Sequence, residues 1–285
     1  METPLTASTK AIPQETATRI DVLTVAAIGV LTYLLASIIH EALGHGLAAL
    51  VLGLHPRHVT SVDLDISYVG VPDWQRRIVD AAGCVAQLLV AFIVLGFMRL
   101  IPTVGSAATR YFLWLLSTIN LIIPGGYLMV MTIVGIGDWE SFVQGLPSPV
   151  IWKVGLVLLG IIISLLGLYS GARGLDMFAG RATEGPEMRR KRRVTLTFIP
   201  YLAGSAALTI SSIFNPDSPL LILISGIAAS FGGTSFLMLI NSVARKPTDT
   251  TPEVPLTPER SWLWIGLGLV ALVIYFAVLG PGLPR

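Results

Sequence analysis

Residues 20–54 read IDVLTVAAIGVLTYLLASIIHEALGHGLAALVLGL, an apolar run that contains His40, Glu41 and His45 in its second half. A helix of about 20 apolar residues is long enough to cross a bilayer. This run is longer, so we expect one crossing followed by a kinked or buried extension. Ionisable side chains inside a membrane segment are costly and indicate function. The stretch therefore predicts a membrane helix that carries a polar site.

Composition places the whole chain in the membrane class. Of its 285 residues, 53% are hydrophobic and 13% are charged, and the mean hydropathy is +0.76. A soluble domain carries about 25% charged residues, so this chain has too few charges to cover a surface that faces water. We predict an all-α polytopic integral membrane protein with about seven transmembrane helices, and we expect it in the plasma membrane. The apolar segments after the first lie near Val79–Ile101, Tyr111–Gly135, Val150–Tyr169, Val194–Phe214, Leu220–Val243 and Trp262–Leu279.

The sequence divides the chain into four parts. Residues 1–19 are polar and predict a disordered N-terminal tail, and residues 20–145 form the membrane core that carries the polar site. Residues 146–245 supply additional transmembrane helices, and residues 246–285 combine a proline-rich linker with a last transmembrane helix. Between the first two apolar segments, residues 58–68 alternate polar and apolar side chains, which predicts a short β-hairpin at the membrane edge.

The basic residues predict the orientation of the chain. Five of the 19 Lys and Arg residues fall on one side of the predicted segments, and the remaining 14, which include Arg189–Arg193, fall on the other. Basic residues favour the cytoplasm, so we expect a cytoplasmic N-terminus and a polar site toward the opposite face. We interpret Arg189–Arg193 as a topological anchor that could also contact anionic lipid. No basic groove with interleaved aromatic residues occurs, which argues against a nucleic-acid partner.

The residues His40-Glu41-Ala42-Leu43-Gly44-His45 have the chemistry of a zinc site. The usual zinc helix, H-E-x-x-H, places two imidazoles on one face and a glutamate beside the metal-bound water. Here the histidines are five residues apart, about 140° around a regular helix, so both can bind one ion only if the helix widens locally. With Cys84 as the one cysteine, any metal must be held by His, Asp or Glu. We therefore predict Zn²⁺ bound by His40 and His45, a π-bulge at Leu43–Gly44, and Glu41 as the catalytic base.

Two other interpretations of this motif remain open. On an undistorted helix, Glu41 and His45 would share one face as ligands, and His40 would support a ligand or take part in catalysis. Alternatively, the three side chains are buried polar groups that bond neighbouring helices. The remaining histidines, His55 and His58, stand beside a proline and are expected to be solvated or interfacial.

The motif and the segments after it resemble the site-2 protease family of intramembrane metallopeptidases. Those chains carry H-E-x-G-H followed by small residues, as residues 45–53 (HGLAALVLG) do, although H-E-x-x-G-H has one residue more, as in the soluble dipeptidyl peptidase III family. They continue with an Ala-Gly-Pro-rich helix start, to which residues 81–87 (AAGCVAQ) are similar, and with an Asn and a Pro, as Asn120 and Pro124. The resemblance covers about residues 30–140. It implies an intramembrane zinc peptidase in which Asn120 holds an extended substrate backbone.

A third metal ligand has to come from a carboxylate. The resembling family has an aspartate soon after the proline, but Gly125-Gly126-Tyr127 stands there in this chain. A catalytic zinc takes three protein ligands, and the carboxylates at segment ends are Asp80, Asp138, Glu140 and Asp176. We favour Asp138, because its segment and the His40–His45 segment run in the same direction and end at the same depth. Glu140 is the reserve.

The expected function is metal-assisted hydrolysis of a peptide bond in a membrane-embedded or membrane-proximal polypeptide. The expected partners are membrane lipid and a membrane-protein substrate or partner subunit. The main alternative is a catalytically inactive membrane scaffold or regulatory subunit with a protease-like fold, because one residue is inserted in the motif and the family's aspartate is displaced. A di-iron oxidase is disfavoured, since the chain has only four histidines.

Overall fold

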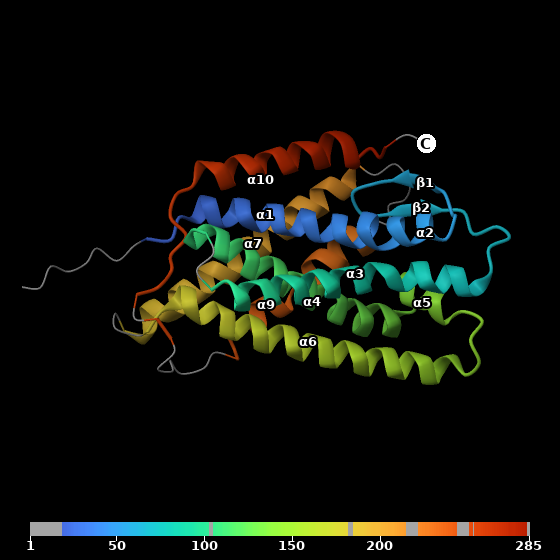
Figure 1. Cartoon of the computed structure of the whole chain (residues 1–285), viewed down its shortest axis with the longest axis horizontal. Helices are drawn as coiled ribbons and strands as arrows, with labels where there is room; N and C mark the ends of the chain where they lie inside the picture. The colour runs from blue at the N-terminus through green and yellow to red at the C-terminus, as the bar shows by residue number, and fades with distance from the viewer. Residues whose placement is uncertain are drawn as a thin grey trace, which may run out of the picture.

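The computed structural model describes residues 19–102, 105–181, 185–214, 222–243, 251–252 and 254–283. The predicted disordered tail, residues 1–19, lies almost wholly outside this range, as does part of the predicted proline-rich linker. The described chain forms an elongated bundle of helices with a small two-stranded sheet at one end (Figure 1).

Among the described residues, six helices are long and apolar enough to cross a membrane. A hydrocarbon layer of about 30 Å needs roughly 20 residues at 1.5 Å each. The six helices therefore indicate a multi-pass membrane protein. They are Val22–Val51 (α1 Val22–Ile38, η1 Ile39–Gly46 and α2 Leu47–Val51), α3 (Asp73–Leu100), α4 (Ala107–Val134), α6 (Pro149–Ala179), α7 (Pro186–Ile213) and Trp262–Leu279 (α10 Trp262–Ile274 and η4 Tyr275–Leu279).

The predicted segment Leu220–Val243 is not a membrane-length helix within the described residues. It forms a π-helix, η3 (Ile222–Gly232), and a one-turn helix, α9 (Phe236–Leu239), with a turn between them that includes Gly233. Adjacent glycines at 232 and 233 weaken a helix, because glycine loses the most backbone freedom on folding. The described residues thus contain six helices of membrane length and one broken segment, where seven transmembrane helices were predicted.

The broken segment lies antiparallel to α7. The Thr209 hydroxyl donates to the Gly226 carbonyl (2.6 Å) toward the end of α7. The Asn241 amide donates to the Thr197 hydroxyl (2.7 Å) toward its start. The chain therefore returns along α7 before α10 begins, and α1 and α10 run in the same direction (Figure 1).

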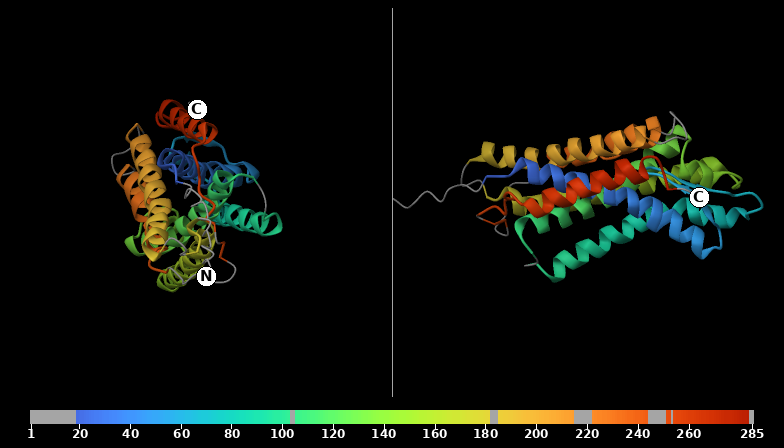
Figure 2. Two further views of the ribbon diagram at one scale, coloured as in Figure 1. Left: turned by 90° about the vertical axis from the view of Figure 1, so that its left-hand side faces the viewer. Right: turned by 90° about the horizontal axis from the view of Figure 1, so that it is seen from above.

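The sheet and a short helix lie together at one end of the bundle. Strands β1 (Pro56–Val59) and β2 (Leu64–Ile66) pair antiparallel, in the region where alternating side chains predicted strands. Helix α5 (Asp138–Val143) contacts α3 at the same end. Figures 1 and 2 show both elements near the place where α1 continues into η1 and α2.

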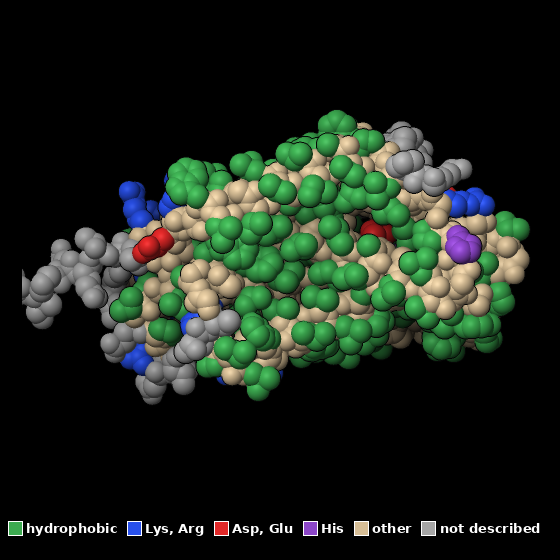
Figure 3. Space-filling model, turned by 45° about the horizontal axis from the view of Figure 1, so that its top comes forward, with side chains coloured by type: hydrophobic (Ala, Val, Ile, Leu, Met, Phe, Trp, Pro, Cys, Tyr) green, Lys and Arg blue, Asp and Glu red, His purple; other side chains and the backbone are tan. Residues whose placement is uncertain are grey.

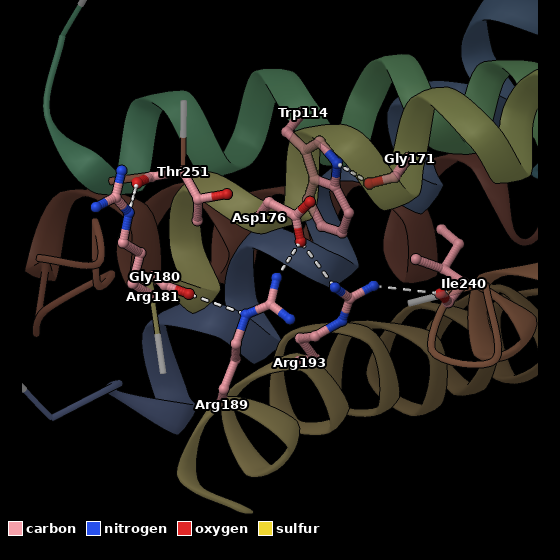
Figure 4. Close-up of polar contacts among 9 residues, drawn as sticks. All are labelled: Trp114, Gly171, Asp176, Gly180, Arg181, Arg189, Arg193, Ile240 and Thr251. Atoms are coloured by element: carbon pink, nitrogen blue, oxygen red, sulfur yellow. Dashed lines mark hydrogen bonds and ion pairs between the residues drawn. The ribbon is translucent and has the colours of Figure 1, made fainter. Parts of the chain in front are cut away.

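The basic run at the other end is partly buried. Arg189 and Arg193 both donate to Asp176 Oδ1, at 2.7 and 2.8 Å, and both are less than a tenth exposed. Arg189 also donates to the Gly180 carbonyl, and Arg193 to that of Ile240 (Figure 4). Two residues of the predicted topological anchor therefore tie α6, α7 and the end of the broken segment together.

Glycines let α1 and α7 cross at close range. A Cβ at Gly29 would lie 2.5 Å from the Pro200 Cα, and one at Gly204 would lie 2.3 Å from the Tyr33 ring. Tyr33 is fully buried and donates its hydroxyl to Thr234 of the broken segment (2.9 Å). This crossing holds α1, and with it the polar site, against α7 and η3.

Gly29→Ala is expected to lower thermal stability, although alanine is normally the better helix residue by about 1 kcal/mol. The added methyl would overlap the Pro200 backbone, and overpacking of this kind typically costs about 1–3 kcal/mol. Gly155→Ala, on α6, has open space around it and should be neutral or stabilising. The measurement is the thermal unfolding temperature of each variant and of the wild type in detergent. Equal transition temperatures would contradict the close crossing.

Candidate metal centre

The π-helix η1 brings His40 and His45 onto one face. The predicted widening of the helix is confirmed, and it extends beyond Leu43–Gly44 over the whole of Ile39–Gly46. A π-helix has i→i+5 hydrogen bonds, so side chains five residues apart come close to one another. The two imidazole rings stand edge to face with centroids 4.7 Å apart. The alternative ligand pair, Glu41 and His45, requires a regular α-helix, and residues Ile39–Gly46 do not form one.

Three potential ligand atoms converge beside this helix. His40 Nε2 lies 3.1 Å from His45 Nε2, and Asp138 Oδ2 lies 3.3 and 3.4 Å from these two nitrogens. Ligands bound to a tetrahedral zinc at about 2.0–2.1 Å stand about 3.3–3.4 Å apart. The observed triangle therefore has the size of one face of a tetrahedral metal site.

The outer hydrogen bonds of the two imidazoles leave lone pairs facing the centre. His45 Nδ1 lies 2.7 Å from the Val79 carbonyl oxygen, which can only accept, so Nδ1 carries the proton. His40 Nδ1 lies 3.1 Å from Gln87 Oε1, whose amide nitrogen donates to the Ala36 carbonyl. That second bond orients the amide, so His40 Nδ1 is also a donor. In the neutral imidazoles both Nε2 atoms are then acceptors.

Two nitrogen lone pairs and a carboxylate oxygen at these distances repel one another unless a metal ion or a proton lies between them. Metal-bound histidines commonly donate their other ring N–H to a carbonyl or a similar oxygen, as both do here. The donor set thus fits a bound metal ion, and the residues that would hold it are His40, His45 and Asp138.

Two glycines make room for the centre. A Cβ at Gly44 would lie 2.4 Å from the Gly83 Cα, so η1 and α3 touch backbone to backbone. A Cβ at Gly83 would lie 2.7 Å from the Nε2 atoms of both His40 and His45. Any side chain at position 83 would therefore intrude on the two ligand atoms.

A sharp turn after α4 carries Asp138 to the histidines. Helix α4 ends at Val134, and Gly135 and Gly137 adopt φ angles of 77° and 78°, which favour glycine. Asp138 then begins α5. A Cβ at Gly137 would also lie 2.5 Å from the Tyr127 hydroxyl, so this glycine leaves space for the phenol.

The electrostatic surroundings keep Asp138 in the form that binds metals. Burial alone would raise the pKa of its carboxyl group. When no metal is bound, positive charge and N–H donors on the His45 and His40 imidazoles outweigh burial and hold this pKa well below its usual range. The carboxylate is therefore the favoured state at neutral pH.

The other predicted carboxylates have different surroundings. Glu140 pairs with Lys153 (2.5 Å), and Asp176 binds two arginines at the opposite end of the bundle. Asp80 is buried in α3 and lines the same cavity as the ligands, but its carboxylate is not one of the three converging groups. Of the four candidates, Asp138 is the one that the structure brings to both histidines.

The structure separates the predicted catalytic and substrate-binding residues. Glu41 lines both cavities that meet at the centre. Asn120 is fully buried in α4, donates to the Leu116 carbonyl of its own helix (2.9 Å) and lines neither cavity. It lies about 10 Å along the helix from Tyr127, which does line them.

Two residues at the centre had no predicted role. Gln87 is 1% exposed and orients His40, and the Tyr127 ring lies 5.8 Å from the His40 ring. The sequence does contain a signal for Gln87, because a polar residue inside an apolar segment indicates function. An aromatic residue such as Tyr127 is ordinary in a membrane helix, so no such signal marked it.

Two cavities meet at the centre. One, of about 310 Å³, is lined by the three ligands, by β2 and by Tyr68, Asp80 and Ser141. The other, of about 80 Å³, shares Glu41 with the first and extends to Leu208 of α7 and to η3. Figure 3 shows an acidic side chain in a hollow of the otherwise apolar face. The centre is therefore bordered on one side by polar residues near the sheet and on the other by apolar helices.

No protein-family model, curated protein or solved structure matches this chain. The interpretation of the site therefore rests on the geometry and chemistry of its own residues.

Gly83→Ala is expected to reduce metal content well below the roughly one ion per chain that a single mononuclear site would hold. The new methyl would press against both imidazoles, and their shift would separate the ligand atoms. Gly96→Ala lies on the same helix with open space around it, and should leave the metal content unchanged. Elemental analysis of purified, folded protein measures both. Full metal content in Gly83→Ala would contradict the proposed position of the ion.

Proposed function

We propose that this chain is an intramembrane zinc-dependent hydrolase of peptide bonds in membrane-embedded or membrane-proximal polypeptides. The observation that carries the proposal is the convergence of three acceptor atoms from His40, His45 and Asp138, with Glu41 in the same cavities. Two imidazoles and a carboxylate suit zinc and also ferrous iron. A glutamate directly after the first histidine favours hydrolysis, because a proton acceptor beside a metal-activated water is what that reaction requires.

Zinc held by the three ligands would supply Lewis-acid polarisation of the substrate carbonyl and a lowered pKa for the attacking water. Glu41 would accept the proton of that water and deliver it to the leaving amine. The Tyr127 hydroxyl, for which Gly137 leaves space beside Asp138, would donate a hydrogen bond to the developing oxyanion. Gln87 and the Val79 carbonyl would keep both imidazoles in the metal-binding tautomer.

The two cavities would serve different needs of an intramembrane reaction. The larger cavity includes Asp63, Asp80 and Ser141, polar groups that can hold water near the sheet. The smaller one includes Leu208 and Ile123, which suit an apolar segment of substrate. A helical substrate would have to unwind locally, because its amides are shielded by their own backbone hydrogen bonds. Asn120 has no part in this proposal, since it lines neither cavity.

The depth of the site favours one membrane face. His40 lies about 27 Å along the helix from Val22, at 1.5 Å per residue, which approaches the thickness of the hydrocarbon layer. With a cytoplasmic N-terminus, the centre would lie near the extracytoplasmic surface of the plasma membrane, and the small sheet would lie at that interface. The basic residues at the opposite end support this orientation.

A catalytically inactive scaffold or regulatory subunit is the alternative proposal. The extra residue in the motif motivated it, but η1 accommodates that residue and keeps both histidines on one face. The metal content distinguishes the two functions, because a scaffold need not hold an ion whereas the enzyme must.

Asp138→Asn and His45→Ala are each expected to lower zinc content by at least about tenfold, since each removes one of three ligands. Glu140→Gln provides the matched control on the same short helix, where Glu140 pairs with Lys153 instead. The measurement is elemental analysis of purified protein, which also tells zinc from iron. If Glu140→Gln lost as much metal as Asp138→Asn, the ligand assignment would be wrong.

Glu41→Gln should keep the metal and lose activity by about 10²–10⁴-fold, because the amide cannot accept the proton. Proteoliposomes that contain membrane proteins of the host, together with wild type or variant, provide a test without a known substrate. Mass spectrometry of labelled N-termini should find new termini with wild type only. Full zinc content with no new termini from wild type would favour the scaffold.

Cysteine labelling should place the two ends of the bundle on opposite sides of the membrane. Val69, which is exposed near the sheet, is a suitable position at the metal end, and exposed Arg190 is suitable at the other. In a Cys84→Ser background, a membrane-impermeant maleimide should label Val69→Cys from outside intact cells and Arg190→Cys only after lysis. The reverse pattern would place the centre at the cytoplasmic face.

A further inference from the structure

A third cavity lies at the end of the bundle opposite the metal centre. It has a volume of about 460 Å³ and lies among the C-terminal end of α3, the first half of α4 and the second half of α6. Figure 2 shows the C-terminal end of α3 diverging from the rest of the bundle at this end. The proposed hydrolase makes no use of this cavity.

Its polar lining carries charge of one sign. Arg99, Arg110 and Arg173 reach it from α3, α4 and α6 respectively, and no acidic side chain is among its described lining residues. The Arg173 guanidinium donates to the Tyr169 hydroxyl (3.0 Å) and lies 5.6 Å from the centre of that ring. Three arginine residues from three helices therefore line one cavity.

Most of the remaining lining residues are apolar, and apolar side chains continue from the cavity along the bundle toward the membrane interior. Trp114 of α4, which is 2% exposed, and Leu95 of α3 both line the cavity. One helical turn further along, Phe92 on α3 and Leu166 on α6 are about half exposed, at 55% and 49%. A polar end of positive charge thus continues into an apolar track between two helices.

We propose that this cavity binds an anionic phospholipid. Guanidinium groups bind phosphate oxygens through paired, charge-assisted hydrogen bonds, and three arginines from three different helices line this one cavity. The acyl chains would lie along Phe92 and Leu166. Arginines that served only to orient the chain in the membrane would need neither a shared cavity nor an apolar base. The predicted cytoplasmic location of this end matches the leaflet in which anionic lipids are enriched.

Native mass spectrometry of the full chain, released from detergent after addition of defined lipids, tests the proposal. Phosphatidylglycerol should remain bound at about one molecule per chain, whereas phosphatidylcholine with the same acyl chains should not, because its headgroup has no net charge. Inorganic phosphate at the same concentration should not displace the lipid. Equal retention of both lipids, or displacement by free phosphate, would overturn the assignment, and this comparison requires no variant.

The variant Arg110→Gln/Arg173→Gln should lower the affinity for phosphatidylglycerol by at least about tenfold, because each basic residue near an anionic lipid contributes roughly fivefold. Arg190→Gln is the matched control, because Arg190 is exposed at the same end of the bundle and does not line the cavity. Zinc content should be unchanged in both variants, so failure of the lipid site and failure of the proposed hydrolase are distinguishable. Equal loss of lipid in the double variant and in Arg190→Gln would show general surface attraction instead of a site.

Discussion

Two imidazoles five residues apart must face the same way inside a membrane-length helix, and the rest of the centre depends on this constraint. A regular helix would separate His40 and His45 by about 140°. The π-helix removes that separation while each backbone N–H still finds a carbonyl five residues back. In hydrocarbon an unpaired backbone group costs several kcal/mol, so widening the helix is less costly than breaking it.

The widened turn in turn constrains its neighbours. Helix α3 has to come close enough for the Val79 carbonyl and Gln87 to accept the outer imidazole protons. The backbone contact between Gly44 and Gly83 allows that approach and leaves the space in front of the ligand nitrogens open. The two histidine ligands, the groups that orient them and the space for an ion therefore come from one helix-to-helix contact, and Asp138 joins them from α5.

The two ends of the bundle balance the charge of a partly buried carboxylate differently. Asp176 shares one oxygen between two guanidinium groups, and its charge is balanced within the protein. Asp138 faces two neutral imidazoles whose lone pairs point at it, so its charge is balanced only by a cation or by protons. This difference explains why only one of the two aspartates belongs to the candidate metal centre, although both lie at the end of a helix segment.

The sequence by itself determined the membrane class, the long first helix, the need for a widened turn at the histidines and the short list of carboxylates, because these follow from apolar run lengths and from fixed spacing along one helix. It also led to the choice of Asp138.

Only the tertiary structure decided what depends on contacts between distant segments. It split the predicted helix at residues 220–243, gave Gln87 and Tyr127 a place at the centre and left Asn120 outside the cavities. It also gathered Arg99, Arg110 and Arg173 around one space. Spacing along the chain carries no information about which faces of separate helices meet, since that is settled by side-chain volume at the contacts, here mostly by glycines.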